Sequence, residues 1–152
     1  MAEDLKMTAR SVLEERTIRS TGLVGGLDEE LMRKVFERNG YSMQVQGKLH
    51  GISGGIHQFN FVCTKFDGSE RIIVESLIPL SSSMEALEVA LVKLRLKTFD
   101  CCPEVNIVVT SHLPEPIKQM ARFYKLTLVE IVDGGRSPYE QIESLLKLKA
   151  DY

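Results

Sequence analysis

The Asp67-Gly68 dipeptide, which lies between two largely apolar runs, constrains the fold more than any other feature of the chain. The run "FNFVCTKF" precedes it and "SERIIVES" follows it. Asp-Gly favours the two-residue turn of a β-hairpin, because such a turn needs backbone with positive φ. With these two residues in the turn, Phe66 is opposite Ser69, and all later pairs follow. The dipeptide therefore predicts the register of two neighbouring antiparallel strands.

This register places a polar pair in an otherwise apolar hairpin. Asn60 falls directly opposite Glu75, and opposed residues share a face of the sheet with Cβ atoms about 4.5–5.5 Å apart. The other face carries side chains typical of a core: Phe61, Val74, Cys63 and Ile72. We interpret the polar pair either as a hydrogen bond at the sheet margin or as the remnant of a functional site.

Helical and strand patterns alternate along the rest of the chain. Apolar periodicity and capping signals predict helices over residues 3–18, 27–38, 81–97, 114–124 and 138–149. Strand patterns cover residues 41–49, 56–64, 71–78, 105–110 and 126–132. An antiparallel first half followed by βαβ crossovers predicts an α/β fold with a mixed central sheet flanked by helices.

Two serines have the spacing of helix-capping boxes. Ser82 precedes Glu85 by three residues, and Ser137 precedes Glu140 by the same interval. Asn39-Gly40 is a typical helix end. These signals predict where three of the helices begin or end.

The N-terminal residues differ from the rest. Residues 1–26 are predicted to form a helix followed by a glycine-rich linker, and residues 27–152 to form one α/β domain. The helix would either pack on the domain or form contacts between two copies of the chain. Its apolar face comprises Leu5, Ala9, Val12 and Leu13.

The composition fits one globular domain in the cytoplasm. The chain has 152 residues, of which 43% are hydrophobic and 26% charged, and this is enough for a substantial core. Its net charge of −2 argues against a surface that is basic all over, although a local basic face is compatible with it. No apolar run approaches the roughly 18 residues of a membrane span, and the N-terminus lacks a signal-peptide core. The three cysteines make a poor disulfide framework.

The segment that leads into the hairpin resembles a known family. In "GKLHGISGGIHQFN" the glycines, Ser53, His57 and Phe59 follow a pattern close to G-x-x-x-G-x-S-G-x-x-H-x-F-D. This pattern is similar to that of small archaeal members of the restriction-endonuclease-like, or PD-(D/E)XK, nuclease superfamily. The resemblance covers residues 28–131, and it implies an αβββαβ core, in agreement with the element order above.

The resemblance implies a site in which an aspartate and a glutamate hold Mg²⁺ and a lysine two residues later orients the attacking water. Glu75 matches the glutamate. Asn60 stands at the aspartate position and Leu77 at the lysine position, so the motif is degenerate. A lysine from another element, such as Lys48 or Lys93, could replace the missing cation. Glu30, or its neighbour Glu29, falls about where an assisting acid of the first helix would lie.

We therefore expect a nuclease-fold protein without cleavage activity that acts as a nucleic-acid-binding or interaction module. The alternatives are an Mg²⁺-dependent DNA endonuclease that uses Glu75, and a protein-binding accessory subunit. Expected cofactors are none or weakly bound Mg²⁺ at Glu75. Expected partners are DNA and a second copy of the chain, without a membrane or a small-molecule cofactor. Basic residues at helical spacing are candidates for phosphate contacts: Lys93, Lys97, Lys118 and Arg122.

Other candidate chemistry carries less signal. His50 and His57 could bind a metal together with Glu75, but they lack a recognised ligand spacing. His57 is more typical of a structural residue at the junction of loop and strand. The glycine-rich residues 132–137 precede a helix N-terminus, where anions can bind, but a simple turn explains them as well.

Overall fold

The computed structural model describes residues 22–77 and 83–150. The helix predicted over residues 3–18 lies outside them. The elements in chain order are β1 (Leu23–Val24), β2 (Leu27–Asp28), α2 (Glu29–Arg38), β3 (Tyr41–Val45), β4 (Lys48–His50), β5 (Ile56–Gln58), β6 (Phe61–Lys65), β7 (Arg71–Ser76), α3 (Met84–Cys101), β8 (Val105–Thr110), α4 (Glu115–Phe123), β9 (Thr127–Glu130) and α5 (Pro138–Ala150).

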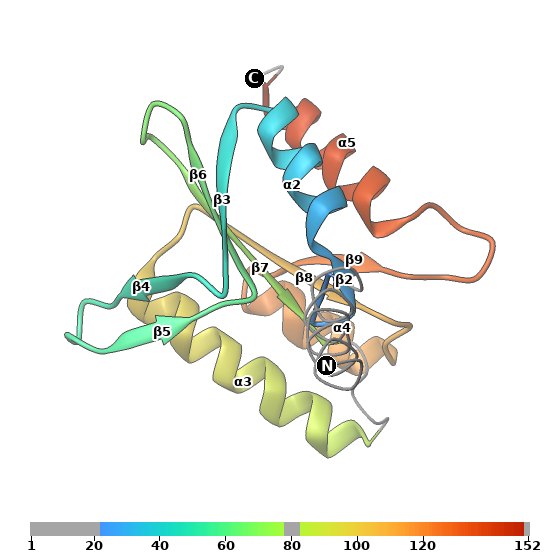
Figure 1. Ribbon diagram of the computed structural model, residues 1–152. Coiled ribbons are helices and arrows are strands. Elements are labelled where there is room, and N and C mark those ends of the chain that lie inside the picture. Colours follow the sequence, from blue (N-terminus) through green and yellow to red (C-terminus); the bar gives the residue numbers. More distant parts are fainter. Residues whose placement is uncertain (1–21, 78–82, 151–152) are drawn as a thin grey trace, which may run out of the picture.

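A five-stranded mixed sheet forms the centre of the domain (Figure 1). Its strand order is β3-β6-β7-β8-β9. The pairs β3–β6 and β6–β7 are antiparallel, whereas β7–β8 and β8–β9 are parallel. Helix α3 connects β7 to β8, and α4 connects β8 to β9. The predicted α/β fold with a mixed sheet is therefore confirmed, and the order α2-β3-β6-β7-α3-β8 is the αβββαβ order that the sequence indicates.

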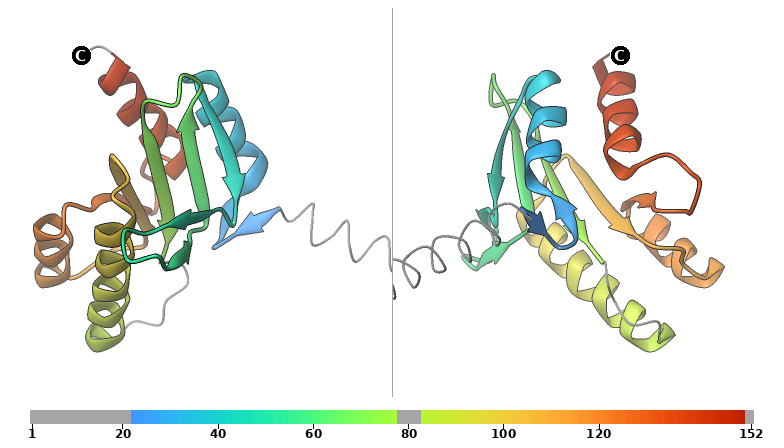
Figure 2. Two further views of the ribbon diagram at one scale, coloured as in Figure 1. Left: turned by 90° about the vertical axis from the view of Figure 1, so that its left-hand side faces the viewer. Right: turned by 45° about the vertical axis from the view of Figure 1, so that its right-hand side comes forward.

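Two helical layers cover the sheet (Figure 2). Helices α2 and α5 share one hydrophobic cluster with inward side chains of the sheet, including Phe61, Ile72 and Val74. Helices α3 and α4 share the other cluster with Val62, Ile73 and Val108. Residues of alternating parity thus point to opposite faces, as pleated strands require. Glu75 follows Ile73 by two residues, so it belongs to the face that α3 and α4 cover.

The hairpin has the predicted register. Phe61 pairs with Val74, and Thr64 with Arg71. The turn itself is longer than expected, because the last ladder bond runs from Lys65 N to Glu70 O at 2.9 Å and leaves residues 66–69 as a four-residue loop. The register survives because the loop adds one residue to each side.

Two predicted strands are interrupted. Gln46 has φ of 51°, and a Cβ on the following Gly47 would lie 2.6 Å from Val62 Cγ2. The chain turns there, and Val62 leaves no room for a side chain at position 47. Residues 41–49 therefore divide into β3 and β4. The strand predicted over 56–64 likewise divides before Phe61. Strands β4 and β5 pair with each other as a separate two-stranded sheet.

The folded domain begins before the predicted boundary at residue 27. Strands β1 and β2 form a small antiparallel pair, and their turn packs against the end of β7. The Ser76 hydroxyl donates a hydrogen bond to Gly25 O, and a Cβ on Gly25 would lie 2.8 Å from Ser76 Cβ. Residues 22–26 are thus part of the domain rather than a free linker.

The helix ends follow the capping signals with one shift. Ser83 caps α3 by accepting a hydrogen bond from Ala86 N at 3.1 Å, whereas the sequence predicts Ser82, which lies outside the described residues. Ser137 accepts from Glu140 N at 3.1 Å, as predicted. Asn39 caps α2 and Gly40 follows with φ of 89°. None of the helices in the described residues is long and apolar enough to span a membrane.

Candidate functional site

Glu75 lies near the carboxyl end of β7, beneath α3. Its side chain is 20% exposed. Oε1 accepts a hydrogen bond from the backbone N–H of Asn60 at 2.5 Å, which continues the hairpin register one step beyond the last ladder pair. The predicted contact between positions 60 and 75 is therefore present, but the backbone of Asn60 makes it and not the amide side chain.

The Asn60 side chain bonds elsewhere. Its Oδ1 accepts a hydrogen bond from Ser76 N at 2.8 Å. The turn of β1–β2 covers this amide, because a Cβ on Gly25 would lie 3.0 Å from Asn60 Oδ1. The oxygen at the family's aspartate position is thus directed toward the backbone of β7. Two hydrogen bonds thus join Asn60 to the end of β7: one from Asn60 N to Glu75 Oε1 and one from Ser76 N to Asn60 Oδ1.

Lys97 of α3 is the cation beside Glu75. Its Nζ lies 3.9 Å from Glu75 Oε2, donates a hydrogen bond to Gln58 O and lies 4.4 Å from the centre of the Phe59 ring. The side chain is 26% exposed. From the sequence, Lys97 is a candidate for phosphate contacts, and Lys48 or Lys93 is named as the replacement lysine. The structure instead brings Lys97 to Glu75.

A sequence signal for Lys97 exists in retrospect. Helix α3 returns over the sheet after β7, and its inward residues include Leu94, Thr98 and Cys101. Lys97 follows Leu94 by three residues, at the border of that inward face. A lysine at such a border extends its stem along apolar surface and places its ammonium group over the sheet.

Burial has the largest influence on the pKa of Glu75. Desolvation raises the pKa of the carboxyl group above its ordinary value, while the Asn60 N–H bond and the Lys97 charge oppose that shift. The charged form is therefore more costly here than in water. Leu77, at the family's lysine position, is 8% exposed and part of the apolar cluster under α3. A charged side chain at that position would lie in this apolar cluster, where an unpaired charge is costly.

Glu30 does not approach Glu75. It lies in the first turn of α2, which covers the opposite face of the sheet. Its carboxylate is 81% exposed and lies 3.7 Å from Lys34 Nζ. Glu29 pairs with Arg33 at 3.3 Å. Neither acid assists Glu75 in this arrangement.

The predicted basic residues lie on the two helices that cover the face of Glu75, but most of them face a carboxylate. Lys118 Nζ lies 3.1 Å from Glu130 Oε1, and Arg122 lies 3.3 Å from Glu115. Lys93 is exposed. The four side chains therefore form separate ion pairs and one exposed position rather than a continuous basic surface.

The donor set at Glu75 does not fit Mg²⁺. One carboxylate oxygen accepts the Asn60 N–H, the other faces the Lys97 ammonium, and the Asn60 amide oxygen bonds to Ser76 N. Mg²⁺ needs near-octahedral oxygen ligands at about 2.0–2.1 Å, usually with one or two carboxylates. No group of three histidine, cysteine or acidic side chains suited to a metal occurs within residues 22–77 and 83–150.

His57 belongs to a polar cluster at the end of α3. Asp100 accepts hydrogen bonds from Ser53 N at 2.8 Å and from Ser53 Oγ at 2.6 Å, and its Oδ2 lies 2.7 Å from His57 Nε2. These bonds, led by those from Ser53, lower the pKa of Asp100 to about 2. The order differs from that of a catalytic triad, because aspartate and not histidine contacts the serine hydroxyl.

The cluster fastens the glycine-rich loop to α3. Ile52 N donates to Asp100 O at 2.9 Å, and a Cβ on Gly51 would lie 1.8 Å from Asp100 Oδ2. Glycine is thus required at position 51 by close approach. His57 has the structural role predicted for it, and His50 is exposed on β4.

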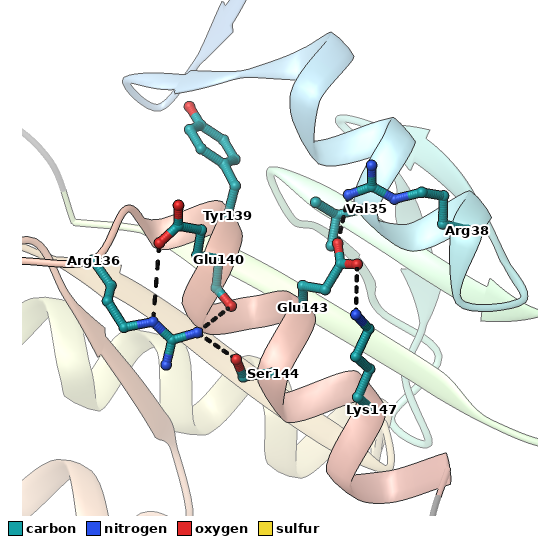
Figure 3. Close-up of a pocket in the computed structure, with 8 residues that line it drawn as sticks. All are labelled: Val35, Arg38, Arg136, Tyr139, Glu140, Glu143, Ser144 and Lys147. Carbon is teal, nitrogen blue, oxygen red and sulfur yellow. Dashed lines mark hydrogen bonds and ion pairs between the residues drawn. The ribbon is translucent and has the colours of Figure 1, made fainter.

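A polar cavity of about 300 Å³ separates α2 from α5 (Figure 3). Its charged side chains pair with one another: Glu143 lies 2.5 Å from Arg38 and 3.3 Å from Lys147, and Arg136 lies 3.9 Å from Glu140. The hydrogen bond from Arg38 lowers the pKa of Glu143. Of these pairs only Arg38–Glu143 joins α2 to α5, and the other two lie within or at the start of α5.

Comparisons with known proteins add little to this geometry. No protein-family model and no curated protein matches the chain. A crystal structure described as a protein of unknown function, AF1548, is similar at 14% identity and a TM-score of 0.48. The alignment covers 66% of this chain and 54% of that chain. A similarity of this size carries no argument about function.

Proposed function

We propose that the chain is a restriction-endonuclease-like domain that does not cleave nucleic acid and acts as an interaction module. The fold class and the αβββαβ order agree with the resemblance of residues 28–131. The observation that carries the proposal is the internal bonding of Glu75 and Asn60, whose oxygens contact Asn60 N, Lys97 Nζ and Ser76 N. The side chains that would have to bind a metal instead contact backbone N–H groups and Lys97, where β6 begins and β7 ends.

The charges favour protein over nucleic acid as the ligand of this module. Three of the four candidate basic residues already face a carboxylate: Lys97, Lys118 and Arg122. Each phosphate contact would have to compete with an internal ion pair, and the net charge of −2 opposes association with a polyanion. Helix α3 in contrast exposes several large apolar side chains on its outer face, and such patches are typical of protein interfaces.

The proposal is tested with supercoiled plasmid and labelled duplex DNA. We expect no cleavage with Mg²⁺ or Mn²⁺, and no change in the anisotropy of the duplex at low salt. Cleavage that disappears in Glu75→Ala would overturn the proposal. Salt-sensitive binding without cleavage, weakened by Lys93→Ala, would instead identify nucleic acid as the ligand of the module.

The alternative is an Mg²⁺-dependent DNA endonuclease, and the position of Lys97 favours it. The motif of the resembled nucleases has a lysine close to the glutamate, and Leu77 stands at that position here. Lys97 supplies a cation beside Glu75 in its place. Asn60→Asp supplies the second carboxylate with the smallest change in shape, and its Oδ1 can still accept from Ser76 N. Mg²⁺ binding by the wild type in calorimetry, tightened in Asn60→Asp, would support this alternative. Plasmid cleavage by the wild type separates this alternative from the proposal.

A further inference from the structure

The five-stranded sheet ends in two edge strands, β3 and β9. Figure 2 shows β3 at one margin of the sheet, beside α2. The outward N–H and C=O groups of an edge strand can pair with a strand of another chain, and proteins block such edges by several means. The contacts of these outward groups therefore decide whether another strand can extend the sheet.

In β3 the odd-numbered residues direct their backbone groups outward. Gln46 N, just beyond the strand, donates to Asn60 O at 2.8 Å, so the even-numbered positions bond to the neighbouring chain of β6. Bonded and non-bonded positions alternate along an antiparallel pair. The outward groups are therefore those of Tyr41, Met43 and Val45. Within residues 22–77 and 83–150, the outward groups of Tyr41 and Val45 have no hydrogen-bond partner.

Arg33 of α2 covers the middle of this edge. Its Nη1 donates a hydrogen bond to Met43 O at 2.9 Å. Two acids of the same helix hold the guanidinium group: Glu29 Oε1 lies 3.3 Å from Nη2, and Glu37 Oε1 lies 4.0 Å from Nη1. A strand that paired with β3 would need Met43 O as an acceptor, and it would have to displace Arg33 from that oxygen.

A second side chain covers the opposite edge in the same way. Ile131 N donates to Thr110 O at 2.8 Å, so residue 131 faces β8. Glu130 then faces outward, because neighbouring residues of a strand direct their backbone groups to opposite sides. Gln141 of α5 donates from Nε2 to Glu130 O at 2.8 Å. The same amide donates to Arg136 O at 3.1 Å, and this second bond fixes its orientation.

The two donors come from the two helices of one layer, and each bonds to an outward carbonyl oxygen of an edge strand. We infer that Arg33 and Gln141 keep the sheet closed to strand addition, and that a second copy of the chain pairs with β3 once Arg33 is removed. Antiparallel pairing about Met43 is symmetric, with Tyr41 of one copy opposite Val45 of the other. Its central hydrogen bonds use Met43 O, the atom that Arg33 covers.

Arg33→Met tests the inference, because methionine keeps an apolar stem and removes the donor. Self-association of the full chain is measured by sedimentation velocity in about 1 M salt, where repulsion between Glu29 and Glu37 of the two copies is largely screened. We expect the association constant to rise at least about tenfold over the wild type, because the central carbonyl becomes available. Lys34→Met is the matched control: it removes a charge of the same helix, and Lys34 pairs with Glu30. It should leave the association constant unchanged.

Hydrogen exchange shows whether β3 forms the contact. In associated Arg33→Met the three outward N–H groups of β3 should exchange at least about tenfold more slowly than in the wild type, because each becomes bonded to the second copy. The N–H groups of Ser42 and Gln44 face β6 and should not change. An Arg33→Met variant that does not associate overturns the inference. Association without slower exchange at the three groups overturns it as well, because the contact then lies elsewhere or follows local unfolding.

Gln141→Leu tests the other edge independently. We expect a smaller rise of about threefold in the association constant, because β9 has four residues and β3 has five. The outward N–H of Leu128 should then exchange more slowly than in the wild type. A Gln141→Leu variant that matches the wild type in both measurements refutes the role of Gln141, whether or not Arg33→Met folds. Neither outcome depends on cleavage of nucleic acid, so this inference and the proposed function are tested separately.

Discussion

Glu75 and Asp100 are two carboxylates of similar exposure, 20% and 16%, whose protonation equilibria shift in opposite directions. Asp100 accepts bonds from Ser53 N, Ser53 Oγ and His57, and its pKa falls to about 2. Glu75 accepts one backbone bond and has its cation 3.9 Å away, and its pKa rises because desolvation dominates. The two carboxylates therefore differ in their leading influence: desolvation raises the pKa of Glu75, whereas hydrogen bonds from Ser53 and His57 lower that of Asp100.

The difference shows which carboxylate is purely structural. Asp100 is fully used in fastening a loop to α3, although serine and histidine surround it. Glu75 accepts a hydrogen bond at one oxygen only, and its other oxygen faces the Lys97 ammonium at 3.9 Å. The charged form of such a carboxyl group costs free energy, and groups with a perturbed pKa often occur at functional sites.

Removal of the cation should give the largest effect. Lys97→Met leaves the Glu75 carboxylate partly buried without an opposite charge, and it also removes the bond to Gln58 O. We expect a loss of about 2 kcal/mol in the free energy of unfolding at pH 7, measured by urea denaturation. In a Glu75→Gln background the same substitution should cost clearly less. Equal losses in both backgrounds would show that Lys97 acts through packing alone.

The next largest effect is expected at the loop. In Gly51→Ala the new methyl group would meet Asp100 Oδ2 at 1.8 Å, so either the loop or α3 must shift. We expect a destabilisation of about 1 kcal/mol, the lower end of the cost of overpacking, because a surface loop can shift. Gly55→Ala is the control, because its Cβ has no contact closer than 3.3 Å. Thermal unfolding of the two variants should differ, and the absence of a difference would contradict the close approach.

The pH dependence distinguishes the two carboxylates directly. Since folding raises the pKa of Glu75, the native state binds more protons than the unfolded state just above the ordinary glutamate value. The contribution of Glu75 to stability is therefore present below that value and is lost as the pH rises through the raised pKa of the folded state. Glu75→Gln should remove this slope from a series of urea denaturations. A slope that persists would assign it to another group.

The smallest effect is expected for Asp100→Asn. The lowered pKa of Asp100 means that its bonds stabilise the loop above the ordinary aspartate value of about 4 and are lost as the pH falls toward about 2. The amide can accept fewer of the three bonds, so the Ser53 N–H should exchange with deuterium faster at neutral pH. Asp133→Asn, in an exposed turn, is the control, and its exchange pattern should match the wild type.

Much of the architecture was predictable from local signals. The Asp67-Gly68 turn predicted the pairing of Asn60 with Glu75, even though the loop has four residues, because a symmetric extension preserves the register. The order of helices and strands followed from periodicity and caps. The interruption at Gln46-Gly47 was not predictable, since the close approach of Val62 to Gly47 comes from another strand.

The candidate site was predictable only in part. Glu75 and Asn60 could be paired, whereas Lys97 was expected to contact phosphates and not Glu75. The contact between Lys97 and Glu75 depends on the position and rotation of α3 relative to β7. The local sequence carries no pattern that specifies this placement. The Ser53–Asp100 bonds are equally non-local, as they join a loop to a helix 47 residues away in sequence.

The sequence by itself determined the α/β order, the hairpin register and the presence of one carboxylate opposite one amide, because these follow from neighbours along the chain and from the two-residue period of a strand. Only the tertiary structure decided that Asn60 turns to Ser76, that Lys97 meets Glu75 and that α3 keeps an apolar face outward. Those outcomes depend on the packing of whole elements, where many weak contacts fix a position that no single residue specifies.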